Sequence, residues 1–165
     1  MGYLGHIITG EGMLTNPKKI TAMVEWPTPK TVKELRGFLG LTDYYRKFIK
    51  GYGIISKPLT ELLKKNGFEW GERAAVAFGS LKEAMTQAPI LALPNFSRPF
   101  ILETDACDTG VRVVLAQDGR PIAFLSQALA PKHLGLSIYD KELIAVLMAV
   151  DKWRLFGGKL FCYQD

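Results

Sequence analysis

Two carboxylates at the ends of regular elements constrain the fold of this 165-residue chain more than any other feature. Residues 100–107 are rich in strand-forming residues and read as a β-strand that ends on Asp105. Residues 139–146 read as the first turns of an amphipathic helix that carries Glu142. A strand end and a helix start are anchored positions, so both carboxylates are candidates for a shared site.

Two more strand-like runs, residues 111–117 and 121–127, lie between these carboxylates. The Asp118-Gly119 pair that joins them favours a tight hairpin. Gly157-Gly158 ends the helix, and residues 159–164 form a last strand. We therefore expect an antiparallel meander of three strands, with the fourth strand parallel to the first after a helical crossover.

The first half of the chain predicts helices instead. Thr31 followed by Glu34 is a capping box, which starts a long helix over residues 31–48. Further helices are expected over residues 18–25, 56–65 and 72–87. Prolines and a change of charge place a linker near residues 88–97. The fold class is α+β and α/β: a helical part followed by a mixed sheet with one flanking helix.

Charge is divided unequally between these parts. Residues 1–67 hold 11 Lys and Arg against 5 Asp and Glu, whereas residues 68–165 hold 10 against 11. The basic half is the candidate for contacting a polyanion, and nucleic acid is the obvious one. On charge alone, a merely soluble basic surface explains the excess equally well.

The helix over residues 31–48 has two distinct faces. One broad half is apolar and consists of Val32, Leu35, Phe38, Leu39, Leu41, Tyr45, Phe48 and Ile49. The opposite arc carries Lys33, Arg36, Gly40, Asp43, Tyr44 and Lys47. A glycine inside a helix costs about 1 kcal/mol relative to Ala, so Gly40 needs a reason.

A series of short motifs occurs in a fixed order between residues 3 and 106. They are Tyr3-Leu-Gly-His-Ile7, Trp26-Pro-Thr-Pro29, Lys33-Glu-Leu-Arg-Gly-Phe-Leu-Gly-Leu41, Tyr44-Tyr-Arg-Lys-Phe48, Lys57-Pro-Leu59, Phe68-Glu-Trp70, Ala88-Pro-Ile-Leu91 and Phe100-Ile-Leu-Glu-Thr-Asp-Ala106. The chain resembles the Pol polyprotein of gypsy-type LTR retrotransposons, from the end of the reverse transcriptase palm into ribonuclease H. The resemblance implies four parts: the end of the palm with the primer-grip hairpin (1–9), thumb and connecting helices (10–87), a linker (88–97) and an incomplete RNase H-like domain (98–165).

In that family, carboxylates hold divalent metal ions against the scissile phosphate of RNA in an RNA–DNA hybrid. The resemblance implies Asp105, Glu142 and Asp165 as catalytic and metal-binding residues, with Mg²⁺ or Mn²⁺ as cofactor. Two-metal hydrolysis needs such converging oxygen ligands. Taken alone, Asp105 is equally a turn residue and Glu142 a residue favoured by the helix dipole. The fourth family carboxylate lies beyond this chain.

Three residues depart from the family pattern. Cys107 replaces the usual Ser, and Arg112 and Val113 replace a small Gly-Ala pair. An Arg beside the carboxylates is able to pair with one of them and compete with Mg²⁺. These departures, and the missing ligand, predict little or no cleavage by this chain.

The helix over residues 31–48 resembles the thumb helix that reverse transcriptases lay along the minor groove of the template–primer. Arg36, Gly40 and Tyr44 match its polar, glycine and aromatic spacing, and Lys33 and Lys47 on the same arc are candidates for phosphate contacts. The alternative is an ordinary solvated face. Tyr3-Leu-Gly-His6 resembles the primer-grip hairpin, although His6 is equally compatible with an isolated surface position.

Two functions from different classes remain. In the first, the chain is a piece of a reverse transcriptase/ribonuclease H that binds template–primer and whose parent degrades hybrid RNA. In the second, it is a non-catalytic nucleic-acid-binding remnant or a domesticated RNase H-like module. No Tyr-x-Asp-Asp occurs, which excludes DNA synthesis by this chain. Expected partners are an RNA–DNA hybrid or DNA duplex and the rest of Pol: palm and fingers, remaining RNase H, and integrase.

No apolar run approaches the roughly eighteen residues of a membrane span, so no membrane partner is expected. The two cysteines make no metal-binding pattern and favour reduced thiols of an intracellular protein. The sequence does not distinguish a cytoplasmic particle from the nucleus.

Overall fold

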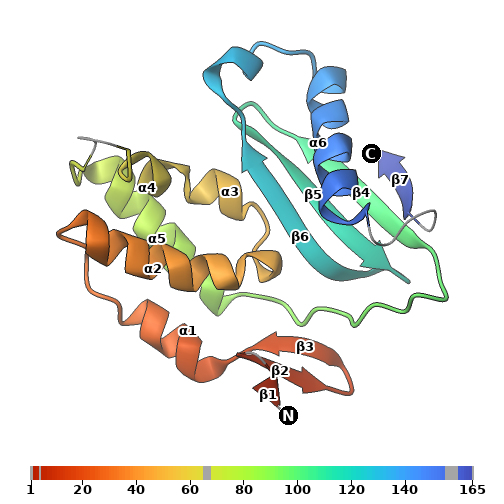
Figure 1. The fold of residues 1–165 in the computed structure, drawn as a ribbon, viewed down its shortest axis with the longest axis horizontal. Helices are drawn as coiled ribbons and strands as arrows, with labels where there is room; N and C mark the ends of the chain where they lie inside the picture. Colours follow the sequence, from red (N-terminus) through yellow and green to blue (C-terminus); the bar gives the residue numbers. More distant parts are fainter. Residues whose placement is uncertain (1, 4, 65–67, 155–159, 165) are drawn as a thin grey trace.

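The computed structural model describes residues 2, 3, 5–64, 68–154 and 160–164, and for residues 2, 3 and 160–164 it describes the backbone. It contains a small three-stranded sheet, a layer of helices and a four-stranded sheet flanked by one helix (Figure 1). The predicted mixed α and β architecture is confirmed. Within the described residues, the helices are all too short or too polar to cross a bilayer.

The small sheet consists of β1 (Gly2–Tyr3), β2 (His6–Thr9) and β3 (Gly12–Thr15), paired antiparallel in that order. Strand β3 was not predicted from the sequence. Gly12 has φ +142°, and an added Cβ would lie 2.1 Å from the carbonyl oxygen of Leu91. A glycine is therefore needed where β3 meets the connector.

The helical layer begins with α1 (Pro17–Val24) and α2 (Val32–Tyr44). The predicted cap of α2 is present, because the Glu34 amide donates to Thr31 Oγ1 over 3.1 Å. The predicted single helix over residues 31–48 is wrong at its end: α2 stops at Tyr44, and a short 3₁₀ turn, η1 (Arg46–Phe48), follows. Tyr45 and Phe48, on either side of this break, are both buried in the core.

The remaining helices of this layer are α3 (Tyr52–Ile55), α4 (Lys57–Glu61) and α5 (Glu72–Thr86). In place of the single helix expected over residues 56–65, the structure has two shorter ones, the first of which begins earlier. They share one core with α1 and α2. Its fully buried members include Met23, Leu35, Phe38, Phe48, Leu59, Leu81 and Met85.

The larger sheet has the predicted topology. Its meander is β4 (Phe100–Ala106), β5 (Gly110–Gln117) and β6 (Arg120–Ala128), and β7 (Leu160–Gln164) runs parallel to β4 on its other side. The crossover passes through η2 (Pro131–His133) and the expected helix, α6 (Ile138–Lys152), whose N-cap is Ser137. A second core joins this helix to the sheet through Phe100, Leu102, Val111, Val113, Leu115, Ala145 and Ala149.

An extended connector runs from α5 to β4 (Figure 1). Leu91 exchanges two backbone hydrogen bonds with Met13 of β3, over 2.7 and 2.9 Å. Farther along the connector, the side chain of Gln117 hydrogen-bonds to its backbone. The Gln117 Oε1 accepts from the Asn95 backbone N–H over 2.8 Å, and Nε2 donates to the backbone carbonyl oxygens of Asn95 and Arg98 over 2.8 and 3.1 Å. The connector thus ties the small sheet to the larger one.

The helical layer meets the larger sheet where α3 lies against β6 (Figure 1). The Gly53 amide donates to Ser126 Oγ over 2.7 Å. An added Cβ at Gly53 would lie 2.6 Å from the Ser126 carbonyl oxygen, and one at Gly110 would lie 2.5 Å from Ile54 Cγ1. The two backbones therefore approach as closely as glycine permits.

We expect Gly53→Ala to lower the free energy of unfolding by about 1–3 kcal/mol, because the new methyl group would collide with a backbone oxygen that cannot turn aside. Gly79→Ala, in the middle of α5 with open space around its Cβ, is the matched control and should raise stability by about 0.5–1 kcal/mol. Urea unfolding of both variants measures the difference. An equal change in the free energy of unfolding in the two variants would show that α3 and β6 can move apart without loss of stability.

Candidate nucleic-acid interface and carboxylate site

The predicted polar face of α2 is exposed. Lys33, Arg36 and Gly40 all lie on the surface, and an added Cβ at Gly40 would meet nothing within 4 Å. Tyr44 ends this row with 47% of its surface exposed. Lys33, Arg36, Gly40 and Tyr44 are hereafter called the α2 row. A ligand could therefore approach the backbone of α2 closely at Gly40, because no side chain in the described part of the chain blocks it there.

Lys47 does not belong to the α2 row, contrary to its predicted place on the same arc. The helix ends at Tyr44, so Lys47 lies on η1 and is partly buried. Its ammonium lies 5.6 Å from the ring centroid of Phe48, and burial lowers the pKa of Lys47 below its ordinary value. The break in the helix is the physical reason for this correction.

His6 is buried, with 9% of its surface exposed, so it is not an isolated surface histidine. Its ring stacks on Tyr44, with ring centroids 5.2 Å apart and planes 10° from parallel. It meets Tyr45 edge-on, with centroids 5.4 Å apart, and Phe48 lies at the same separation. Residues that approach from distant positions form this cluster, which is why local sequence patterns did not reveal it.

A groove of about 430 Å³ separates α2 from the end of β6. Arg36 and Gly40 form one wall, and Gln127 belongs to the opposite wall. Arg46 also lines it: its Nη1 lies 3.1 Å from Asp43 Oδ1, and its guanidinium carbon lies 5.2 Å from the Tyr52 ring centroid. The polar face of α2 thus opens toward the larger sheet.

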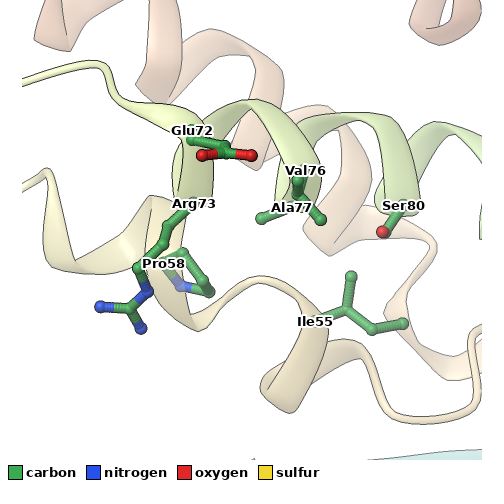
Figure 2. A pocket seen from close by; sticks show the side chains of 7 residues that line it. All are labelled: Ile55, Pro58, Glu72, Arg73, Val76, Ala77 and Ser80. Atoms are coloured by element: carbon green, nitrogen blue, oxygen red, sulfur yellow. The ribbon is translucent and has the colours of Figure 1, made fainter.

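A second hollow, also of about 430 Å³, lies between α5 and the α3–α4 segment (Figure 2). Its lining is mostly apolar and consists of Ile55, Pro58, Glu72, Arg73, Val76, Ala77 and Ser80. The lining contains no predicted functional residue, so this hollow does not contribute to the candidate sites.

Asp105 lies at the end of β4, on the face opposite the second core. Strand alternation buries Leu102 and Thr104 on one face and exposes Glu103 and Asp105 on the other. Directly across the strand pair, Arg112 forms an ion pair with Asp105. Arg112 reaches there past Gly51, whose added Cβ would lie 3.7 Å from Arg112 Cδ. The pairing anticipated from the sequence is therefore present.

Glu142 occupies the second turn of α6 and is partly exposed. The helix is anchored by its cap, where Asp140 N–H donates to Ser137 Oγ over 3.2 Å. Ala145 of the same helix packs on the face of the sheet opposite Asp105. The described contacts do not join Glu142 to Asp105, and Asp165 lies outside the described residues.

The two described carboxylates, Asp105 and Glu142, do not form a divalent-metal site by themselves. Within the described ranges, the structure places no three His, Cys, Asp or Glu side chains where they could hold an ion. The guanidinium of Arg112 already satisfies the charge of Asp105. Cys107, another departure from the family, serves the following turn: its thiol lies 3.3 Å from the Gly110 carbonyl oxygen. The metal site and its Mg²⁺ remain predictions.

Comparison with known proteins agrees with this architecture. Residues 70–161 match the model of a family described as the RNase H-like domain found in reverse transcriptase. The Pol polyprotein from transposon 297 of Drosophila melanogaster is 44% identical over 99% of this chain and 16% of that protein. The Pol polyprotein from transposon gypsy of the same species is 36% identical over 95% of this chain and 17% of that protein. The chain thus spans less than a fifth of these relatives.

Two solved structures share the fold. A foamy viral protease-reverse transcriptase in complex with RNA/DNA hybrid superposes with a TM-score of 0.91 at 23% identity, over 99% of this chain and 23% of that one. The dRH form of the same viral protein, in complex with ds DNA, gives 0.92 at 23% identity, over 99% of this chain and 30% of that one. At this identity the likeness concerns the fold.

The buried cluster generates a pH prediction. Burial, and then the positive charge of Lys47, lower the pKa of His6 below its ordinary 6.5. The unfolded chain therefore binds a proton more readily than the folded one, so stability is complete above about pH 6.5 and falls as the pH drops below it. In urea unfolding from pH 7 to pH 5, His6→Phe should lose less stability than the wild type.

His133→Gln removes the other histidine, which lies on η2 away from the cluster, and should keep the wild-type pH profile. A His6→Phe profile parallel to that of the wild type would contradict the assigned role of His6.

Proposed function

The chain belongs to the family of RNase H-like domains found in reverse transcriptases. From this premise we propose that it binds the template–primer through the α2 row. The template–primer is an RNA–DNA hybrid or a DNA duplex. The observation that supports this most directly is the open surface of Arg36, Gly40 and Tyr44 in the more basic half of the chain. The similarity of the chain to Pol polyproteins also supports the proposal that it binds nucleic acid.

The chemistry of the α2 row suits a groove of a duplex. Lys33 and Arg36 are exposed cations that attract phosphates and release counterions when they bind them. Gly40 presents helix backbone without a side chain, which permits a close approach to sugars. Tyr44 offers a flat ring with a polar tip, and such rings provide large contact area at low entropic cost. These contacts position a duplex without reading its sequence.

For the whole Pol polyprotein, the proposed activity is reverse transcription together with metal-dependent hydrolysis of RNA in the hybrid. Asp105, Glu142 and Asp165 are the proposed ligands of Mg²⁺ or Mn²⁺. In this chain, Arg112 opposes that role at Asp105. We therefore propose that residues 1–165 bind nucleic acid without efficient cleavage. The alternative, a non-catalytic nucleic-acid-binding remnant or domesticated RNase H-like module, is distinguished by assaying the longer protein.

Reversing charge on the α2 row tests the binding proposal. We expect Lys33→Glu combined with Arg36→Glu to weaken binding to an RNA–DNA hybrid by at least about tenfold at low salt. The slope of log affinity against log salt should fall by roughly one unit for each phosphate that the variant no longer neutralises. Fluorescence anisotropy over a salt series measures both quantities.

Lys19→Glu combined with Lys132→Glu makes the same change of charge at exposed positions on α1 and η2, and it is the matched control. If both double variants lose affinity equally, net charge alone drives binding and the α2 row has no special part.

The ion pair at Asp105 generates a prediction about metal affinity. Arg112→Ala removes a positive charge beside the carboxylate and frees its oxygens, so we expect Mn²⁺ to bind about threefold to tenfold more tightly than to the wild type. Electron paramagnetic resonance of free Mn²⁺ measures the binding. Asp105→Asn in the Arg112→Ala background should abolish the gain. Unchanged affinity in Arg112→Ala would exclude competition by this guanidinium.

A further inference from the structure

The α2 row ends in an aromatic ring that is exposed on one side and supported on the other. We infer that His6 is a positioning residue, whose ring holds Tyr44 in the orientation in which it meets the bound duplex. This inference rests on the proposed binding through the α2 row. It adds a residue from a separate element, β2, whose own side chain is buried.

The contact between the two rings is extensive and directional. His6 and Tyr44 stack with centroids 5.2 Å apart and planes inclined by 10°. Tyr45 stands edge-on to both rings, at 81° to His6 and 90° to Tyr44. Aromatic pairs of these kinds favour particular ring geometries over free rotation. Tyr44 is thus restrained although nearly half of its surface faces solvent.

The support for His6 comes from the backbone of the small sheet. His6 pairs with Tyr3 of β1 and Thr15 of β3, which fixes its position from both sides. The preceding residue, Gly5, accepts a 2.6 Å hydrogen bond from the Tyr45 hydroxyl. An added Cβ at Gly5, where φ is +80°, would lie 3.1 Å from Tyr44 Cε1. The sheet is therefore tied directly to the end of α2.

The environment of His6 suits a flat, uncharged ring. Among the described residues, Nδ1 of His6 is buried and has no hydrogen-bond partner. Burial and the nearby charge of Lys47 lower the pKa of His6, which favours the neutral form. Stacking thus accounts for the described contacts of this ring better than hydrogen bonding does. A phenylalanine at this position should preserve the positioning, whereas an alanine should not.

Holding the ring before binding matters energetically. An unsupported tyrosine on a helix surface samples several rotamers, and ordering such a side chain at an interface costs free energy. A ring that is already ordered avoids this cost, so the support from His6 should appear as tighter binding. Because the effect acts through Tyr44, it should disappear when Tyr44 is removed.

A double-mutant cycle with the full chain tests this coupling. We expect His6→Ala to weaken binding to an RNA–DNA hybrid about threefold to tenfold, and His6→Phe to bind within about twofold of the wild type. In a Tyr44→Ala background, His6→Ala should cause little further loss. The slope of affinity against salt should stay unchanged in His6→Ala, because the buried His6 ring, whose pKa is lowered, offers no charge to a phosphate. Urea unfolding confirms that each variant is folded at the temperature of the titration.

The possible outcomes separate the inference from the function on which it rests. If charge reversal at Lys33 and Arg36 weakens binding but His6→Ala does not, binding through the α2 row stands and the positioning role is wrong. Equal losses of affinity from His6→Ala with and without Tyr44 would also overturn the positioning role, because the effect of His6 would then be a general structural one. If charge reversal at Lys33 and Arg36 has no effect on binding, the proposed function is wrong, and the inference about His6 is wrong with it.

Discussion

The close contact between α3 and β6 sets how the helical half and the larger sheet are arranged. Gly53 donates to Ser126 at a point where a side chain would not fit, so the backbones determine the spacing there. Because α2 shares its core with α3 and α5, this contact also fixes the α2 row relative to the sheet. The stack of His6 on Tyr44 attaches the small sheet to the end of α2. A duplex on the α2 row would therefore meet one connected framework.

Features encoded locally could be predicted from the sequence, and features that depend on distant partners could not. The caps at Thr31 and Ser137 and the strands around Asp118-Gly119 follow from neighbouring residues. Strand β3 depends on pairing with β2, and the end of α2 depends on burying Tyr45 beneath the small sheet. For the same reason, local patterns misplaced Lys47 and did not reveal the burial of His6.

The candidate sites show the same division. Exposure of Arg36 and Gly40 follows from helix periodicity, and the Asp105–Arg112 pair from the expected hairpin partners. Whether Glu142 approaches Asp105 depends instead on how α6 crosses the sheet and on which face of β4 each carboxylate occupies. Alternation within β4 puts Asp105 on the face that α6 does not cover. A resemblance identifies candidate ligands by their positions in the sequence, but it does not say on which face of the sheet each side chain lies.

Electrostatics then assigns different parts to the two halves. Described ion pairs occur at the larger sheet and its loops, where Arg112 pairs with Asp105 and Arg98 with Asp118, and in the helical half, where Arg46 pairs with Asp43. On α2, Lys33 and Arg36 stay exposed to solvent, where phosphates can reach them. Because a polyanion is attracted to charges that are not already neutralised, its first contact should be with the helical half.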